Sequence, residues 1–163
     1  MHSRPTVRLW TAAIGVVVVV LSGCSSSSST RQGEVAARGA QVMPFDLKAT
    51  THTFVDTSQG GIERVTADDP SDTKQIALIR QHLRRESRRF SAGDYRDPAR
   101  IHGMNMPGVG ELRSRAGEVR VTYASQSAGA TITYAAADPA LVTAVHRWFE
   151  RQLVDHGGDA QRG

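Results

Sequence analysis

The fold is decided by residues 118–139, which read EVRVTYASQSAGATITYAAADP. Apolar side chains alternate with Arg or Thr over residues 119–123 and again over residues 130–134. A period of two is typical of a strand with one buried face, and residues 125–129 have the composition of a turn. The sequence therefore predicts an antiparallel hairpin whose water-facing side carries Arg120, Thr122, Thr131 and Thr133.

A helix is expected directly after this hairpin. Asp138 suits the N-cap and Pro139 the first helical position. Gly157 and Gly158 are expected to stop the helix. Its apolar stripe consists of Val142, Val145, Phe149 and Leu153.

The first half of the chain repeats this order. A strand pattern over residues 45–56 is followed by a turn, a return strand over residues 62–67, and Asp69-Pro70 as a helix cap. The recurrence of turn, cap and stripe favours an internal duplication of about 70 residues over a chance recurrence of common motifs. The apolar stripe of this first helix consists of Ile76, Ile79, Leu83 and Phe90.

These patterns predict an α+β domain with a four-stranded antiparallel sheet, built from two ββα repeats, with two helices packed on one face. A single domain is expected over residues 41–156. It comprises repeat one (about 45–90), a crossover (91–116) and repeat two (117–156). The crossover is rich in Gly and Pro, so we expect it to be irregular apart from a short helix over residues 107–114. Long loops of this kind are often functional.

The N-terminal segment has the features of a bacterial secretory signal. Arg4 and Arg8 precede an apolar run, which ends in Leu21-Ser22-Gly23-Cys24. That run, residues 9–21, is shorter than the roughly 17–25 residues that a transmembrane helix requires. The last four residues resemble the bacterial lipobox. The resemblance implies that residues 1–23 are a signal peptide and that Cys24 carries acyl chains such as palmitate, anchoring the protein on the extracytoplasmic face of the cell membrane.

Composition narrows the remaining choices. Ser-rich residues 24–40 are expected to be a flexible tether, and residues 157–163 a disordered tail.

The chain has 20 Lys and Arg against 16 Asp and Glu, and the signal contributes two of the basic residues. The near balance that is left argues against nucleic acid as a partner. Cys24 is the only cysteine, which excludes disulfides, cysteine nucleophiles and zinc–cysteine sites in the domain.

The crossover holds the chemically most suggestive cluster, His102-Gly103-Met104-Asn105-Met106-Pro107-Gly108. Imidazole and thioether ligands suit a soft ion, above all Cu(I). On an extended backbone His102, Met104 and Met106 would point to the same side, so one ion could meet all three. The alternative is that the methionines fill a gap over the core and His102 lies on the surface.

Other histidines are candidates for the same site. His52 lies in the expected first strand, and His156 ends the last helix beside Asp155, a carboxylate that can orient a ligating ring. His146 flanks the apolar stripe of that helix. Each of them, taken alone, is also explained by a structural role.

A search for catalytic motifs finds no Gly-x-Ser-x-Gly, phosphate loop or His-Glu-x-x-His. Several short stretches resemble a family of small bacterial exported proteins often labelled aspartate carbamoyltransferase. The resemblance implies that His52, His102 and His156 belong to the family pattern, and that carbamoyl transfer is one candidate activity. The matching stretches are Met43-Pro44-Phe45-Asp46, Thr50-Thr51-His52-Thr53-Phe54, Ile101-His102, Met106-Pro107-Gly108 and Asp155-His156.

The function expected from the sequence is that of a membrane-anchored binding module. Its ligand would be copper, another soft metal or a small polar molecule, bound by His102, Met104 and Met106 with His52 and His156. One alternative is an interaction or structural lipoprotein that meets a protein or cell-wall partner through the open sheet face. A second alternative is an enzyme such as the carbamoyltransferase of the label.

Overall fold

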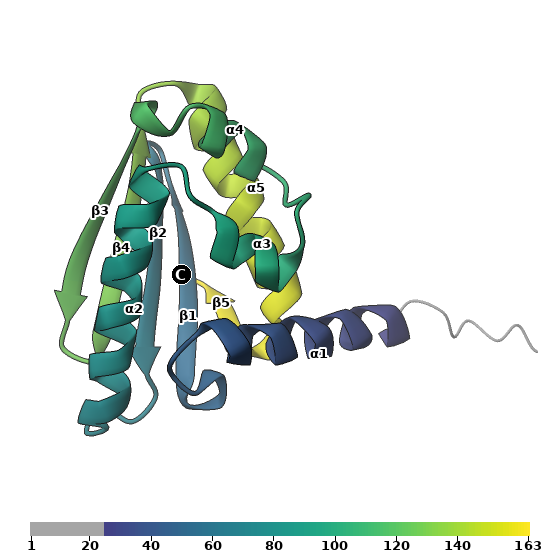
Figure 1. Cartoon of the computed structure of the whole chain (residues 1–163), viewed down its shortest axis with the longest axis vertical. Helices are drawn as coiled ribbons and strands as arrows, with labels where there is room; N and C mark the ends of the chain where they lie inside the picture. The colour runs from purple at the N-terminus through teal and green to yellow at the C-terminus, as the bar shows by residue number, and fades with distance from the viewer. Residues whose placement is uncertain (1–24) are drawn as a thin grey trace, which may run out of the picture.

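A computed structural model describes residues 25–163 (Figure 1). The expected signal peptide and Cys24 lie outside these described residues. Within them the chain forms five α-helices and five strands. In chain order these are α1 (Ser25–Val42), β1 (Thr50–Thr57), β2 (Gly60–Ala67), α2 (Thr73–Ser91), α3 (Arg96–His102), α4 (Val109–Ser114), β3 (Val119–Gln126), β4 (Gly129–Ala136), α5 (Pro139–His156) and β5 (Ala160–Arg162).

The strands form one mixed sheet in the order β3-β4-β2-β1-β5. The first four strands pair antiparallel, as predicted, whereas β5 runs parallel to β1 and places Ala160 opposite His52. The predicted α+β class is confirmed, but the sheet is larger than the four antiparallel strands expected. The C-terminal tail is ordered rather than disordered, because Gly157, with a φ of 55°, ends α5 and allows the chain to return to the sheet edge.

Helices α2 and α5 cover the same face of the sheet (Figure 1). Phe90 of α2 and Trp148 of α5 have ring centroids 5.6 Å apart, and both rings contact Tyr134 of β4. All four residues of the predicted α2 stripe are buried. Of the predicted α5 stripe, Val145 and Phe149 are buried, whereas Val142 and Leu153 are half-buried. Leu141, Ala144 and Trp148 complete the buried face of α5, which packs with that of α2 on one face of the sheet.

The caps of the two helices differ in one respect from expectation. Asp138 caps α5 as predicted, accepting a hydrogen bond from the Ala140 amide at 2.8 Å. The cap of α2 is Asp72, which accepts from the Gln75 amide at 3.0 Å. Asp69, the residue expected to cap α2, accepts instead from Ser71 in the preceding turn.

The crossover is more regular than expected, because it contains α3 as well as the predicted helix, here α4. Pro98 lies in the first turn of α3, a position that proline tolerates, and Gly103 ends the helix with a φ of 97°. His102 is therefore the last residue of a helix rather than part of an extended strand.

The expected tether is also different, since residues 25–42 form helix α1. After the serine run come good helix formers, and Val35 is buried against the domain. Helix α1 packs on α3 and α5. Within residues 25–163, none of the helices combines the length and apolar character needed to cross a membrane.

The opposite face of the sheet carries the Arg and Thr side chains predicted to meet water. Arg120 and Thr122 are exposed on the edge strand β3. Thr131 is buried, in contrast to expectation, because it lies on an interior strand between neighbours and its hydroxyl donates to the Ala124 carbonyl at 3.4 Å.

Candidate functional site

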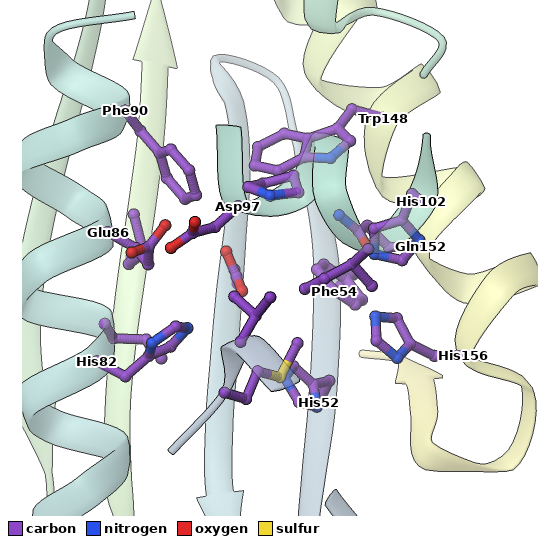
Figure 2. Close-up of a pocket in the computed structure, with 17 residues that line it drawn as sticks. His52, Phe54, His82, Glu86, Phe90, Asp97, His102, Trp148, Gln152 and His156 are labelled. Atoms are coloured by element: carbon purple, nitrogen blue, oxygen red, sulfur yellow. The ribbon is translucent and has the colours of Figure 1, made fainter. Parts of the chain in front are cut away.

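A pocket lies between the sheet and the helices that cover it (Figure 2). Strands β1, β2 and β4 form its floor, helices α2, α3 and α5 form its walls, and Val42 and Met43 at the end of α1 close one side. Its volume is about 40 Å³. Because one water molecule needs about 10–15 Å³ of such space, the pocket has room for roughly three water-sized groups.

Three histidines singled out in the sequence meet in this pocket: His52 from β1, His102 from the end of α3 and His156 from the end of α5. The ring centroids of His52 and His156 are 5.3 Å apart, with an angle of 11° between the ring planes. Those of His102 and His156 are 5.1 Å apart, at 69°. His156 therefore lies between the other two rings.

His102 is oriented by Asp155. The Nδ1 atom of His102 lies 2.9 Å from Oδ2 of Asp155, which also receives Arg31 and Arg151 at 2.8 and 3.1 Å. Burial alone would raise the pKa of Asp155, but the hydrogen bonds from Arg31 and His102 outweigh it and hold this pKa below its usual value. The charged carboxylate has only lone pairs, so Nδ1 of His102 carries the proton and Nε2 keeps its lone pair.

Burial also keeps the other two rings neutral. It lowers the pKa of His156 to about 4, and the neighbouring His102 acts in the same direction. The pKa of His52 lies well below its usual value because of burial, to which the proximity of His156 adds. Each neutral ring has one nitrogen lone pair that can accept a hydrogen bond or bind a metal ion.

The two methionines are not brought to the histidines. Met104 is 70% exposed, whereas Met106 is buried in the core cluster. Both line a different cavity, on the other side of α3, together with Tyr95 and Val109. The loop does not assemble the soft-ion site expected from the sequence, because His102 lines the histidine pocket and not the cavity that the two methionines line.

His146 has a structural role. Its Nε2 atom lies 2.8 Å from the carbonyl oxygen of Gly60 and 3.1 Å from that of Thr57. It therefore donates to the turn between β1 and β2 and fixes α5 against that hairpin. It does not line the histidine pocket.

The pocket has a second side that the sequence reasoning missed. Glu63 of β2, His82 and Glu86 of α2, and Asp97 of α3 line it opposite the three histidines. A signal for two of them was available. Glu86 continues the helical spacing of the buried stripe, and His82 is adjacent to it in that stripe, so both were ionisable residues on a face predicted to be buried.

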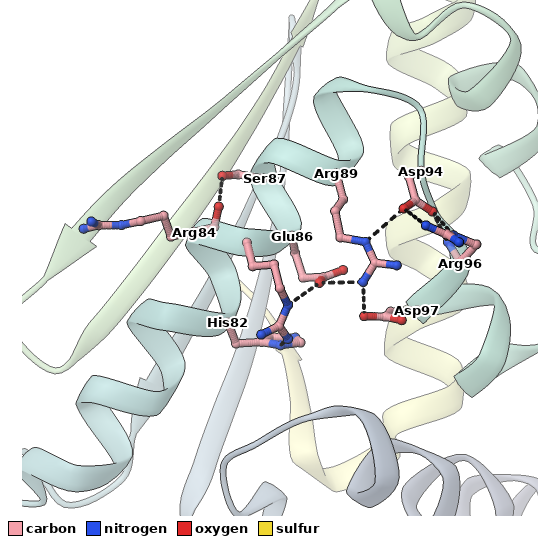
Figure 3. A network of polar contacts seen from close by, with 9 residues as sticks. His82, Arg84, Glu86, Ser87, Arg89, Asp94, Arg96 and Asp97 are labelled. Carbon is pink, nitrogen blue, oxygen red and sulfur yellow. Dashed lines mark hydrogen bonds and ion pairs between the residues drawn. The ribbon is translucent and has the colours of Figure 1, made fainter.

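Glu86 and Asp97 are bridged from outside the pocket by Arg89 (Figure 3). The Nη1 atom of Arg89 lies 3.3 Å from Oε1 of Glu86 and also contacts Asp97. Burial raises the pKa of Glu86 to about 7, and the charge of Asp97 acts in the same direction. Arg85 forms a hydrogen bond with Nδ1 of His82 at 2.7 Å, and burial lowers the pKa of this histidine to about 4.

The pocket concentrates buried polar atoms that lack a partner. In the part of the chain that the structure describes, these atoms are His52 Nδ1, Glu86 Oε2, Tyr123 OH and Trp148 Nε1. His52, Glu86 and Trp148 all line the pocket. Because each buried unpaired group costs about 1–3 kcal/mol, three in one small pocket indicate a site prepared for a polar ligand.

Among the described residues, no group of three His, Cys, Asp or Glu side chains is arranged so that it could hold a metal ion. The three histidines are close together, but their donor atoms do not converge as a metal centre requires. Copper binding would therefore need the rings to rotate.

The chain matches no family model, no curated protein and no solved structure. The resemblance to the exported family therefore stays an expectation.

Proposed function

We propose that this protein is a lipid-anchored, extracytoplasmic binding module that holds a small polar ligand in its histidine pocket. The observation that carries the proposal is the presence of three unpartnered buried polar atoms, His52 Nδ1, Glu86 Oε2 and Trp148 Nε1, in residues that line one pocket. A ligand that pairs with them recovers the free energy lost by their burial.

The surrounding contacts support a pocket whose shape is fixed in advance. Asp155, which is fully buried, fixes His102 and is itself held by two arginines. Arg31 also donates from Nη2 to the carbonyl oxygen of His102 at 3.0 Å. A pre-organised pocket loses less entropy when it binds its ligand.

The binding function is tested with a library of small polar compounds and the mature chain (residues 24–163) carrying Cys24→Ser, which removes only the proposed lipid site. Ligand-detected NMR should find binders that the His156→Phe variant loses, because the larger apolar ring fills the space between His52 and His102. A library without any binder would contradict the proposal.

The anchor is tested separately. The lipobox resemblance supports attachment of the mature protein to the membrane through Cys24. In a bacterial host the wild type should enter the membrane fraction and incorporate labelled palmitate, whereas Cys24→Ser should lose the label. Equal labelling of the two proteins would contradict the lipoprotein assignment.

Copper or another soft metal is a second candidate ligand, which the neutral rings and the Asp155 contact to His102 favour. Titration with Cu(I) and Ag(I) tests it. Affinity weaker than micromolar would rule out a soft metal as the ligand. If a Met104→Leu/Met106→Leu variant keeps the affinity of the wild type, the metal is bound by the histidines alone.

Two further functions each have one observation in their favour. Exposed Arg120 and Thr122 on an edge strand suit an interaction lipoprotein. A pull-down in which the Arg120→Glu variant captures a different set of partners than the wild type would support this function.

Glu86, with a pKa of about 7 beside neutral histidines, suits general acid–base catalysis. Carbamoyl transfer to aspartate that is abolished by His102→Ala would favour the enzyme.

We also propose that the two ββα units arose by duplication. Both consist of an antiparallel hairpin followed by a long helix that covers the same sheet face, and both helices begin with an Asp cap. Similar amide-exchange protection of the two hairpins would be consistent with this, and superposition of the two units offers the direct test.

A further inference from the structure

We infer that the ligand of the histidine pocket is a small ammonium-type cation, held between carboxyl groups on one side and neutral histidines on the other. This inference rests on the proposed binding function, since it names the chemical class of the ligand. It follows from an excess of acceptors over cations among the residues that line the pocket.

The lining residues carry acceptors and no fixed positive charge. Glu63, Glu86 and Asp97 all line the pocket, whereas none of the described residues lining it is Lys or Arg. Arg85 and Arg89 contact Glu86, but they approach it from outside the pocket. The histidines add lone pairs rather than charge, because their rings are neutral.

Glu63 is the carboxyl group that most needs a counter-ion. Its Oε2 accepts a hydrogen bond from the hydroxyl of Tyr134 at 3.0 Å. No Lys, Arg or His among residues 25–163 forms an ion pair with it. Burial raises the pKa of Glu63 to about 7, and Glu86 acts in the same direction. A cation that enters the pocket would stabilise the ionised form of this carboxyl group.

Glu86 supplies the hydrogen-bonding atom. Its side chain is buried and its Oε2 has no partner, while Oε1 receives Arg89. An N–H group of an ammonium ion that donates to Oε2 would form a charge-assisted hydrogen bond. On the opposite side, His52 and His156 offer neutral acceptors to a second N–H group.

Aromatic rings complete the surroundings. Phe54, Phe90 and Trp148 line the pocket, and Figure 2 shows Phe90 and Trp148 on one side of it, with His52 and His156 on the other. Aromatic faces attract cations, and most strongly where water is excluded. The volume of about 40 Å³ admits ammonium or methylammonium together with a water molecule that accepts from Trp148 Nε1.

Other ligand classes fit less well. An anion would meet carboxyl groups without an opposing guanidinium inside the pocket. A bare metal ion needs three or more converging donors, and the described residues offer no such group. Hydrogen bonds from N–H groups are longer and tolerate a wider range of donor positions than metal–ligand bonds.

The test is calorimetric titration of the mature chain carrying Cys24→Ser with matched probes in sodium buffer at pH 7.5. Methylammonium should bind at least tenfold more tightly than methanol, its neutral counterpart of similar size, and than formate. The Glu86→Gln variant should lose at least tenfold in methylammonium affinity, and Glu63→Gln provides an independent second variant. Glu111→Gln, at an exposed carboxylate paired with Arg147, should bind like the wild type.

Each result discriminates. Equal binding of methanol and methylammonium, or binding unchanged in both carboxyl variants, overturns the cation and leaves the proposed binding function intact. Binding of Zn²⁺ or Ag(I) without methylammonium overturns it in favour of a metal. Preferential binding of formate overturns it in favour of an anion. If none of these probes binds, the cation is rejected, while the wider compound library decides separately whether the pocket binds any ligand. Circular dichroism of each variant confirms that it is folded.

Discussion

Nδ1 of His102 donates a hydrogen bond to Oδ2 of Asp155 across 2.9 Å, and the two side chains are only 2% and 0% exposed. The same carboxylate receives Arg31 from α1 and Arg151 from α5. One carboxylate therefore joins three helices at the edge of the pocket. Its removal should affect stability as well as the site.

The Asp155→Asn variant should lower the free energy of unfolding by about 3–5 kcal/mol, because it leaves the partners of a buried charge unpaired. Urea denaturation followed by circular dichroism measures this loss. Glu111→Gln, at the exposed ion pair with Arg147, is the matched control and should change stability by less than about 1 kcal/mol. Equal losses in the free energy of unfolding for the two variants would show that the Asp155 network stabilises the fold no more than an exposed ion pair does.

The contribution of the buried histidines to stability should fall on acidification. Unfolded histidines bind a proton near pH 6.5, whereas burial lowers the pKa of His82 and His156 to about 4 in the folded state. The unfolded chain therefore binds more protons between these values. The contribution of the two histidines to the free energy of unfolding should decrease as the pH falls from about 6.5 towards 4, by up to about 1.4 kcal/mol per pH unit for each histidine.

Glu63 and Glu86 act in the opposite direction. Their pKa values are raised to about 7, so their contribution to stability is present at low pH and is lost as the pH rises towards 7. Urea denaturation from pH 4.5 to 8 should show a shallower loss on acidification for His156→Gln and a steeper one for Glu86→Gln. Superimposable profiles for the wild type and both variants would contradict the assignment of these groups.

Gly108→Ala should destabilise the protein by about 2–5 kcal/mol. Gly108 has a φ of 81°, and a Cβ atom there would lie 2.0 Å from the carbonyl oxygen of Ala144 in α5. Gly110→Ala is the matched control two residues further on, where a Cβ atom meets nothing within 4 Å. It should leave the melting temperature unchanged or raise it slightly, and a similar loss in both variants would argue against close packing of α4 on α5.

Arg31→Ala should loosen α1. It removes two hydrogen bonds to Asp155 and one to the carbonyl oxygen of His102. Charged hydrogen bonds of this kind contribute about 1.5–3 kcal/mol each, so amide exchange in α1 should accelerate at least tenfold. Arg100→Ala, at an exposed position of α3, is the control. Unchanged exchange in α1 after Arg31→Ala would mean that Val35 packing alone holds the helix.

The hairpins and the two long helices were predictable because their signals are local. Alternation around Val121 and Ile132, and the stripe around Ile79 and Leu83, each arise within one element. The ordered C-terminus was not predictable, since β5 is stabilised by pairing with β1, far away in the sequence, and by an ion pair between Arg162 and Glu150 of α5. Helix α1 starts with a serine run of low helix propensity and depends on tertiary contacts such as the burial of Val35.

The candidate site was predicted only in part. His52, His102 and His156 were predicted from short stretches that resemble the exported family, and the structure brings their rings together. The role assigned to Met104 and Met106 depended on an extended backbone from His102 onward, whereas His102 is the last residue of α3 and Gly103 ends that helix with a φ of 97°. Glu63 and Glu86 were overlooked because single carboxyl residues carry no spacing signal, although Glu86 occupies a position of the buried stripe.

If Cys24 is lipidated, as proposed, helix α1 would also set the distance between the pocket and the membrane. With Cys24 lipidated, as proposed, the first helical residue follows the lipid directly, and Arg31 is already clamped to the domain. At about 1.5 Å per helical residue, Arg31 lies on the order of 10 Å along α1 from the attachment point, and Val42, which lines the pocket, on the order of 27 Å. The pocket would then stay within about 30 Å of the lipid attachment point as the protein moves in the plane of the membrane.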